Sequence, residues 1–514
     1  MPPIPPLRPA TPWFSWGAAS LVLLIAAGTA LRLYQLDGFS LWEDELFSVA
    51  TASQSGPWYG PLVTGKNMEQ LQLADSFWTW KFADPHPPLY ELLLALWIKL
   101  FGLSDFAIRS LSAVLGVGAM LSVFALPRSV GWLARAVYTL LMASAGMLLV
   151  YSQDARNYML GAFLSAWMLV LLIRQHDHDP ASLRAGRPGV LLLVAASLLC
   201  LTHYYGVLMV AGVAASAMRV VRKPAALLRG ALRWAATFVP VGGYILLGWT
   251  GIATKLDAAP QKGLSWGMAF KRNVLALLKN VDPAAGSTQF WIFMLLALAA
   301  LLIHRRLRIQ RQPLQAAVGT TVCVLAVFSL LLAMGTRRVE FFSPRYMIFM
   351  VPGCLLLVAL CAQVRGWPRV LSLLLAAFLV PAGLQDWLRS PRPQNGGDWR
   401  GAAEQVARAY QPGDVVVFPL QDPTMRAHFQ HYLRKHIPSE QLQTHLFSIT
   451  DAGTLPGLIA QLPARPPKVI VFTHWVFTPR ALATVEVLQT QLGCTAQDWQ
   501  QVQSLRYSVL HCPT

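Results

Sequence analysis

Three consecutive acidic residues, Glu43, Asp44 and Glu45, follow Trp42 shortly after an apolar stretch that is long enough to cross a bilayer. Carboxylates at a membrane surface gain nothing from lipid and repel anionic head groups, so they mark a candidate functional site. A carboxylate in this position suits a general base. A solvated loop beside an interfacial tryptophan explains the same residues without chemistry, and spacing alone leaves both interpretations open.

Three further polar segments, 84–90, 151–158 and 342–346, interrupt the apolar sequence and supply other side chains that such a site needs. With Arg109, which follows the first segment after an apolar stretch, they contribute two aspartates, one histidine and three arginines: Asp84, Asp154, His86, Arg109, Arg156 and Arg345. Because the planar guanidinium group pairs with phosphate oxygens, we expect the three arginines to converge on one anion site.

A general base beside a phosphate site at the outer membrane face favours group transfer from a lipid phosphate. No nucleotide pool exists outside the cell, so an activated donor must arrive attached to a lipid. Simpler explanations stay open for each residue. Asp154 and Arg156 could form an ordinary interfacial ion pair, and His86 between two prolines could shape a turn. Arg109 and Arg345 could extend to lipid head groups.

The rest of the sequence predicts the elements that position these side chains, a bundle of membrane helices. Of the 514 residues, 55% are hydrophobic and 13% are charged, whereas soluble proteins carry about 25% charged residues. We predict about eleven transmembrane helices from apolar stretches that approach the roughly 20 residues needed to cross a bilayer: 14–34, 106–126, 132–150, 157–173, 189–202, 204–221, 233–250, 289–304, 315–334, 346–363 and 368–386.

The distribution of charge predicts the orientation of this bundle. The net charge is +18, but the lysines and arginines gather in short loops on alternate sides of the predicted spans, which argues against a nucleic-acid partner. This pattern is typical of cytoplasmic loops. We therefore expect a multi-pass protein of the plasma membrane, the inner membrane in bacteria, with a cytoplasmic N-terminus. An odd number of spans then places the acidic segment and the C-terminal region on the extracytoplasmic, or periplasmic, side.

Residues 390–397 are rich in proline and glycine and therefore predict a linker. This linker separates the apolar part of the chain from a region whose pattern is typical of a soluble α/β domain. We predict two domains: a membrane domain over 1–388 with an outward loop over 35–105, and an extracytoplasmic α/β domain over 389–514. The second is predicted from helices at 398–410, 423–435 and 479–492 and buried strands at 415–418 and 469–472. Cys494 and Cys512 fall in this domain, and an oxidising compartment permits a disulfide between them.

Five motifs in order resemble the GT-C superfamily of polytopic glycosyltransferases, in particular its protein O-mannosyltransferase and lipid A aminoarabinose transferase relatives. They are Leu41-Trp42-x-Asp44-Glu45, His86-Pro87-Pro88-Leu89-Tyr90, Phe106 to Ala113, Tyr151 to Tyr158, and Ser343-Pro344-Arg345-Tyr346. The resemblance covers residues 14 to 386. It implies a GT-C fold and an inverting transferase that moves a hexose or pentose from a polyprenyl-phosphate donor to an extracytoplasmic glycan, lipid or protein.

The resemblance also implies roles for individual residues. Asp44 is the expected catalytic carboxylate, Glu45 supports it and Asp154 completes the acidic site. The expected substrate-binding residues are His86, Arg109, Arg156, Tyr158, Arg345 and Tyr346, of which the three arginines would hold the donor phosphate. His86 stands where the aminoarabinose transferases have a lysine, which leaves the acceptor open. No cofactor is required by the pattern, although some relatives hold a divalent metal, for which Asp44 and Asp154 would be the ligands.

Two other classes of function are compatible with parts of the sequence. A transporter or lipid flippase would bury charges within the spans of two related halves, whereas the strong charges here lie at span ends. A cytoplasmic nucleotide-sugar transferase is supported only by Asp177-His178-Asp179, an acidic string on a short loop without a nucleotide-binding domain around it. Membrane glycosyl transfer is therefore the leading interpretation.

Overall fold

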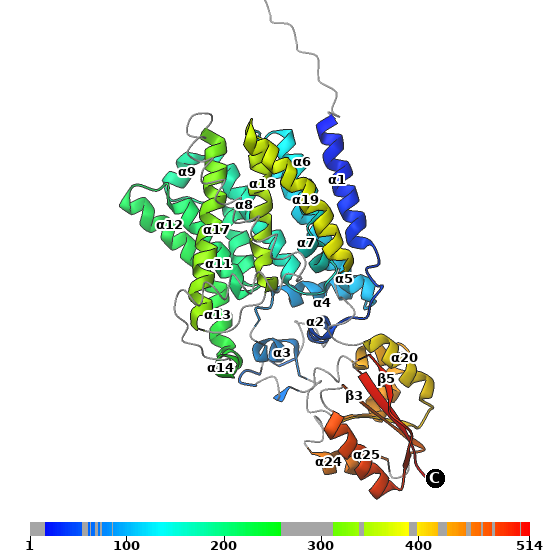
Figure 1. Cartoon of the computed structure of the whole chain (residues 1–514). Helices are drawn as coiled ribbons and strands as arrows, with labels where there is room; N and C mark the ends of the chain where they lie inside the picture. Colours follow the sequence, from blue (N-terminus) through cyan, green and yellow to red (C-terminus); the bar gives the residue numbers. More distant parts are fainter. Residues whose placement is uncertain are drawn as a thin grey trace, which may run out of the picture.

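The computed structural model describes residues 16–53, 60–61, 63–66, 70–71, 75–84, 86–258, 312–338, 344–389, 398–419, 429–448, 454–463, 466–474, 478–503 and 505–513. Its first part is a bundle of apolar helices, and its last part contains a mixed β-sheet (Figure 1). In Figure 1 the sheet lies beyond the end of the bundle where α2, α3 and α4 are found. The opposite end of the bundle carries the start of α1.

The bundle is built from α1 and a series of helices that begins at α5. Their bounds are Trp16–Leu33 (α1), Asp105–Leu121 (α5), Trp132–Ser144 (α6), Gly146–Ser152 (α7), Tyr158–His178 (α8), Val190–Cys200 (α10), Tyr204–Met218 (α11), Pro224–Ala236 (α12), Val239–Leu247 (α13), Trp249–Ala258 (α14), Gln312–Arg338 (α17), Val351–Ala362 (α18) and Trp367–Arg389 (α19). Short helices η2 (Ser122–Ala125), α9 (Pro180–Arg184) and η3 (Pro344–Phe349) join them.

Among the described residues, three helices are long and apolar enough to cross a membrane: Asp105–Ala125, Tyr158–His178 and Trp367–Arg389. Two bent helix pairs raise that number to five if each pair is one span. Five shorter apolar helices coincide with five more of the predicted stretches. The predicted stretch 289–304 lies outside the described residues, so the total of about eleven spans stays a prediction.

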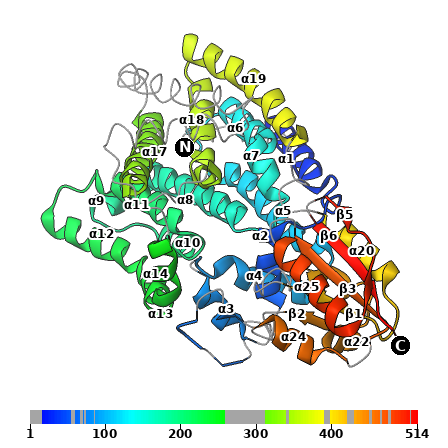
Figure 2. The ribbon, with the colours of Figure 1, turned by 60° about the horizontal axis from the view of Figure 1, so that its bottom comes forward.

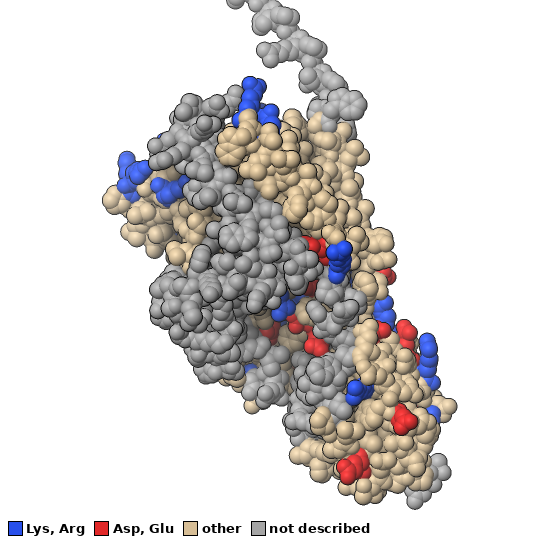
Figure 3. Space-filling view, in the orientation of Figure 1, with Lys and Arg blue, Asp and Glu red and all other residues tan. Residues whose placement is uncertain are grey.

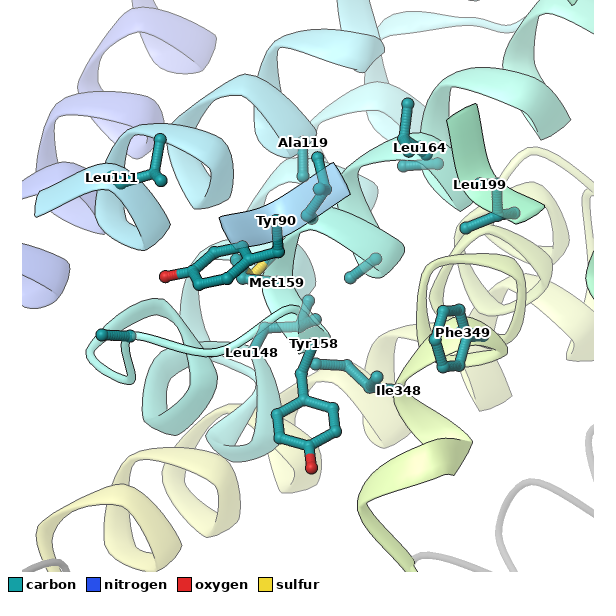
Figure 4. Close-up of a cluster of buried hydrophobic side chains, with 14 of the residues drawn as sticks. Tyr90, Leu111, Ala119, Leu148, Tyr158, Met159, Leu164, Leu199, Ile348 and Phe349 are labelled. Atoms are coloured by element: carbon teal, nitrogen blue, oxygen red, sulfur yellow. The ribbon is translucent and has the colours of Figure 1, made fainter. Parts of the chain in front are cut away.

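Helix α8 lies in the middle of the bundle and packs against α5, α10, α17 and η3. Its close approach to η3 depends on Gly161, because a Cβ there would collide with the ring of Phe349. Figure 4 shows the resulting cluster, in which Ile348 lies between Tyr158 and Phe349. The hydroxyl of Tyr158 points away from the labelled apolar side chains. This packing brings η3, which carries Arg345, to the start of α8.

Arg32, near the end of α1, is fully buried in the bundle. Its guanidinium donates to the carbonyl oxygens of Gly28 at 2.9 Å and of Met142, on α6, at 2.8 Å. Gly116 on α5 makes room for it, because a Cβ at that position would lie 2.6 Å from the Arg32 Nε. A buried charge is thus solvated by backbone carbonyls of a neighbouring helix.

The predicted outward loop over 35–105 contains three helices, α2 (Glu43–Ser53), α3 (Phe77–Ala83) and α4 (Leu89–Phe101). A buried lysine on α3, Lys81, joins them by donating to Asp84 at 2.8 Å and to Glu91 at 3.2 Å. Burial lowers the pKa of Lys81, but the two carboxylates more than offset it and raise the pKa overall. A charged lysine is therefore stable inside this segment.

The C-terminal region has helices α20 (Trp399–Ala409), α22 (Ser439–His445), α24 (Leu455–Gln461) and α25 (Thr478–Leu492). Its strands are β1 (Val415–Phe418), β2 (Leu446–Ser448), β3 (Lys468–His474), β4 (Thr495–Ala496), β5 (Gln500–Val502) and β6 (Leu505–His511). The sheet order is β2-β1-β3-β6-β4, with β5 also paired to β6. The pairs β1–β2 and β1–β3 are parallel, whereas β6 runs antiparallel to β3.

These elements confirm most of the predicted α/β pattern. The predicted helix at 398–410 is α20, and Asp398 caps it by accepting from the Gly401 amide at 3.0 Å. The predicted strands are β1 and part of β3, and the predicted helix at 479–492 is α25. The predicted helix at 423–435 lies partly outside the described residues. The predicted Cys494–Cys512 disulfide is confirmed, with the two Cα atoms 4.0 Å apart.

Candidate active site

The acidic segment forms the first turn of α2, where backbone amides favour negative charge. Successive residues of a helix point in different directions, and Asp44 and Glu45 accordingly differ in exposure. The Asp44 side chain is 34% exposed, whereas that of Glu45 is 1% exposed. The Oδ2 of Asp44 accepts from Nη1 of Arg345 at 3.0 Å. Asp44 is therefore the accessible carboxylate of the pair.

Arg109 on α5 binds Glu45 with both ends of its guanidinium group, with Nε to Oε1 at 2.7 Å and Nη2 to Oε2 at 2.6 Å. Its other N–H groups donate to the carbonyl oxygens of Leu36, Phe39 and Ser40. These contacts use all five donors of a guanidinium group. The structure therefore shows Arg109 fixing the loop that leads to α2, and its hydrogen bonds do not support the predicted role in holding the donor phosphate.

Glu45 joins this loop to the polar segment between α7 and α8. Its Oε1 also accepts from the backbone amide of Ala155 at 2.8 Å, and its Oε2 from the amide of Trp42 at 3.1 Å. Each carboxylate oxygen thus has two donors. With four donors on its two oxygens, Glu45 is less suited to proton transfer than Asp44, and these bonds are consistent with a supporting role.

Asp154 accepts from the indole Nε1 of Trp42 at 3.0 Å. Burial, together with the charge of Glu45, raises the pKa of Asp154 above its usual range. Arg156 donates instead to the carbonyl oxygen of Asp44 at 3.1 Å and to Ser48 Oγ at 2.8 Å. Asp154 and Arg156 therefore do not form the ion pair with each other that a simple interfacial role required.

Two of the three expected arginines meet at Asp44. Arg345 pairs with its carboxylate and Arg156 with its backbone carbonyl. The Arg345 guanidinium carbon also lies 5.6 Å from the ring centroid of Tyr158 and 6.0 Å from that of Tyr346. Within the described part of the chain, the buried Nε atoms of Arg156 and Arg345 have no hydrogen-bond partner. The site thus holds buried cationic donors that a bound anion could satisfy.

His203, which the sequence reasoning did not select, lies beside these arginines. It precedes α11, and its Nδ1 accepts from the backbone amide of Tyr205 at 3.1 Å. Burial and the nearby charges of His86, Arg156 and Arg345 hold the pKa of His203 well below its usual range. The ring is therefore neutral with its proton on Nε2, a buried donor without a partner among the described residues. The signal in the sequence was the polar break at 202–205 in an apolar stretch.

His86 belongs to the same neighbourhood. Its Nδ1 lies 2.8 Å from the Oδ1 of Asp84, and its ring centroid lies 5.6 Å from that of His203. The Tyr346 ring also lies next to that of His203, with the two ring centroids 4.8 Å apart. The structure thus brings together His86, Arg156, Tyr158, Arg345 and Tyr346, all of which the resemblance implied.

The two carboxylates expected to hold a metal do not form a ready cation site. One Asp44 oxygen is paired with Arg345, whose positive charge competes with a cation, and one Asp154 oxygen accepts from Trp42. No group of three or more potential ligands from histidine, cysteine, aspartate and glutamate occurs among the residues that the structure describes. Divalent cations in proteins usually take more oxygen ligands than these two side chains supply.

No family model and no curated protein sequence matches the chain. Solved structures of ArnT from Cupriavidus metallidurans do match it. The apo form is 16% identical with a TM-score of 0.54, and the form bound to undecaprenyl phosphate is 14% identical with a TM-score of 0.56. Both matches cover 96% of this chain and 98% of ArnT. ArnT is a lipid A aminoarabinose transferase of the GT-C class. The chain therefore has the same overall fold as ArnT along nearly its whole length.

Proposed function

We propose that this protein is an integral membrane glycosyltransferase that moves a sugar from a polyprenyl-phosphate donor to an extracytoplasmic glycan, lipid or protein. One observation carries the proposal: an accessible carboxylate, Asp44, lies against the guanidinium groups of Arg156 and Arg345, whose buried Nε atoms have no partner among the described residues. A base next to an anion site is what transfer from a phosphate ester requires. The shared fold with ArnT, one structure of which holds undecaprenyl phosphate, supports it.

In the proposed reaction, the Asp44 carboxylate takes the proton of an acceptor hydroxyl group. The hydroxyl oxygen then forms a bond to the anomeric carbon of the donor sugar. The bond between that carbon and the phosphate oxygen breaks, and the electron pair leaves with the polyprenyl phosphate. Direct displacement inverts the anomeric centre. Because Asp44 is 34% exposed, a hydroxyl group can approach it from solution.

The developing charge on the leaving phosphate is stabilised by Arg345 and Arg156 in this proposal. His203 adds a neutral N–H donor, and His86 lines the same side of the site. The rings of Tyr158 and Tyr346 both lie close to the Arg345 guanidinium. Asp154 acts through Trp42, whose ring centroid lies 5.9 Å from the Arg345 guanidinium carbon. No step requires a metal ion.

We further propose that the protein has two domains, 1–388 and 389–514. Its N-terminus lies in the cytoplasm and its C-terminal domain on the extracytoplasmic side. Figure 3 supports this orientation, because lysines and arginines occupy the end of the bundle that is remote from the sheet. Acidic side chains gather instead between the bundle and the sheet. A positive end facing the cytoplasm follows the rule for membrane proteins.

The test is a comparison of envelope glycolipids, glycans and glycoproteins by mass spectrometry, in cells that contain the wild-type protein, the Asp44→Asn protein or neither. We expect one class of molecule to carry an additional sugar only with the wild-type protein. The polyprenyl-phosphate sugar should accumulate in the other two strains. Identical profiles in all three strains, at equal protein levels, would refute the proposed function.

A further inference from the structure

A second buried polar cluster lies at Asp105, the first residue of α5. Its carboxylate accepts from three side chains of the C-terminal region. Tyr432 donates its hydroxyl proton to Oδ2 at 2.8 Å, Lys435 donates to Oδ1 at 2.9 Å, and Arg400 donates to Oδ2. Asp105 is 4% exposed. Such a set of charge-assisted bonds ties the C-terminal region firmly to the start of α5.

The same side chains reach past Asp105 to the loop that leads into α2. The hydroxyl oxygen of Tyr432 accepts from the backbone amide of Leu41 at 2.7 Å. Arg400 donates to the carbonyl oxygens of Asp37 and Phe39, each at 3.0 Å. Tyr432 is fully buried, so neither of its bonds is easily replaced by water. Figure 2 shows the C-terminal sheet region next to α2, α4 and α5.

The loop is therefore held from two sides. Arg109 lies one turn after Asp105 on α5 and binds the carbonyl oxygens of Leu36, Phe39 and Ser40 as well as Glu45. Residues four apart on a helix lie on the same face, so α5 presents both groups to the loop. Asp44 follows the held residues directly, and any shift of Leu41 moves it.

We propose that the C-terminal region positions the catalytic loop, with Tyr432, Arg400 and Lys435 as positioning residues that act on Asp44 through Leu41 and Asp105. The effect on catalysis rests on the proposed function, whereas the effect on the loop does not. An error of about 1 Å in the position of a catalytic group can cost about 10²-fold in rate. A region without side chains in the site thereby controls turnover.

The first test measures amide hydrogen exchange of peptides that contain residues 36–45, in the full-length protein in lipid nanodiscs. Tyr432→Phe removes the acceptor for the Leu41 amide and a donor to Asp105. We expect exchange in this segment to become about fivefold to tenfold faster. The matched control is Tyr507→Phe, because the Tyr507 hydroxyl binds Gln405 and Gln500 within the C-terminal region. The control should leave exchange in 36–45 unchanged.

The second test measures kcat and KM for the polyprenyl-phosphate sugar. Tyr432→Phe should lower kcat by about 10- to 100-fold and change KM by less than about twofold, because the donor groups stay in place. Tyr507→Phe should keep both values.

Each outcome decides one point. Unchanged exchange in Tyr432→Phe overturns the positioning of the loop. Faster exchange with an unchanged kcat overturns its importance for catalysis, and so does an equal loss of kcat in the Tyr507→Phe control. If the wild-type protein transfers no sugar while Tyr432→Phe exchanges faster, the loop contact stands and the proposed function fails.

Discussion

The Asp44→Asn substitution tests the proposed base, and the structure allows its effect on the reaction to be separated from its effect on stability. Asp44 makes an ion pair with Arg345 in which both side chains are about a third exposed. Such a pair contributes at most about 1 kcal/mol to the free energy of unfolding. The amide of asparagine cannot accept the proton. We therefore expect normal yield and a transfer rate lower by about 10² to 10⁴.

Glu45→Gln is the matched substitution at the neighbouring position and should behave in the opposite way. Oε1 and Oε2 of Glu45 each accept from Arg109 and from one backbone amide. Whichever oxygen becomes an NH₂ group, two donors lose their acceptor. Arg109 is then a buried charge without its counter-ion, which costs about 3 to 5 kcal/mol of stability. We expect low yield and a lower unfolding temperature.

The assay compares both variants with wild type at equal protein concentration in detergent. It records the unfolding temperature and the rate of sugar transfer from a polyprenyl-phosphate donor. Near-normal transfer by Asp44→Asn would remove Asp44 as the base. A Glu45→Gln protein that unfolds at the wild-type temperature but transfers as slowly as Asp44→Asn would move the base to Glu45. Either result refutes the assignment made from exposure and hydrogen bonding.

Three other predictions concern the donor site, the buried acid and the disulfide. Arg345→Lys should raise the KM for the donor about tenfold or more without loss of yield, because an ammonium group cannot replace the planar fork; an unchanged KM contradicts this. For Asp154, burial raises the pKa from the usual 3.8 to about 8, so the wild-type protein loses stability as pH rises from about 4 to about 8 and loses no more from this group above that interval. Asp154→Asn keeps an acceptor for Trp42 and cannot ionise, so the variant should lose less stability than wild type over that interval, as thermal unfolding at several pH values will show. Cys494→Ser should lower the stability of the C-terminal region by about 3 kcal/mol, measured by its resistance to proteolysis; equal resistance in both proteins argues against it.

The sequence reasoning located the polar segments of the site but could not assign partners within it. The residues around Asp44 were selected because they lie at a similar depth in the membrane, and the structure does place Arg156 and Arg345 beside Asp44. The same criterion did not predict the partners of Arg109, since depth does not reveal that three loop carbonyls and Glu45 already satisfy its guanidinium group. Hydrogen-bond satisfaction depends on the local path of the backbone, which spacing does not encode.

Other features escaped prediction because they depend on contacts between distant residues. His203 lies in an apolar stretch, where a single polar break does not by itself indicate a site residue. Only its position next to Arg156 and Arg345 in the folded protein shows that it belongs to the site. Tyr432 binds Leu41 across 391 positions of sequence. Strand β6 was also missed, although it pairs with β3, β4 and β5. A buried strand whose polar residues face neighbouring elements lacks the simple alternation that identifies a half-exposed one.

The contacts of Arg32 with backbone carbonyls constrain the order in which the membrane helices take their final positions during synthesis. Arg32 is made early in synthesis, but its acceptors include Met142 on α6, 110 positions later. A charged group in hydrocarbon is costly, so in the nascent chain the end of α1 is more stable at the lipid–water interface, with Arg32 extended to head groups. Only when α6 enters the membrane can the guanidinium group move into the bundle. The segment that leads to Asp44 starts directly after Arg32, so the first span and the acidic turn reach their final places only after helices α1 to α6 have been translated.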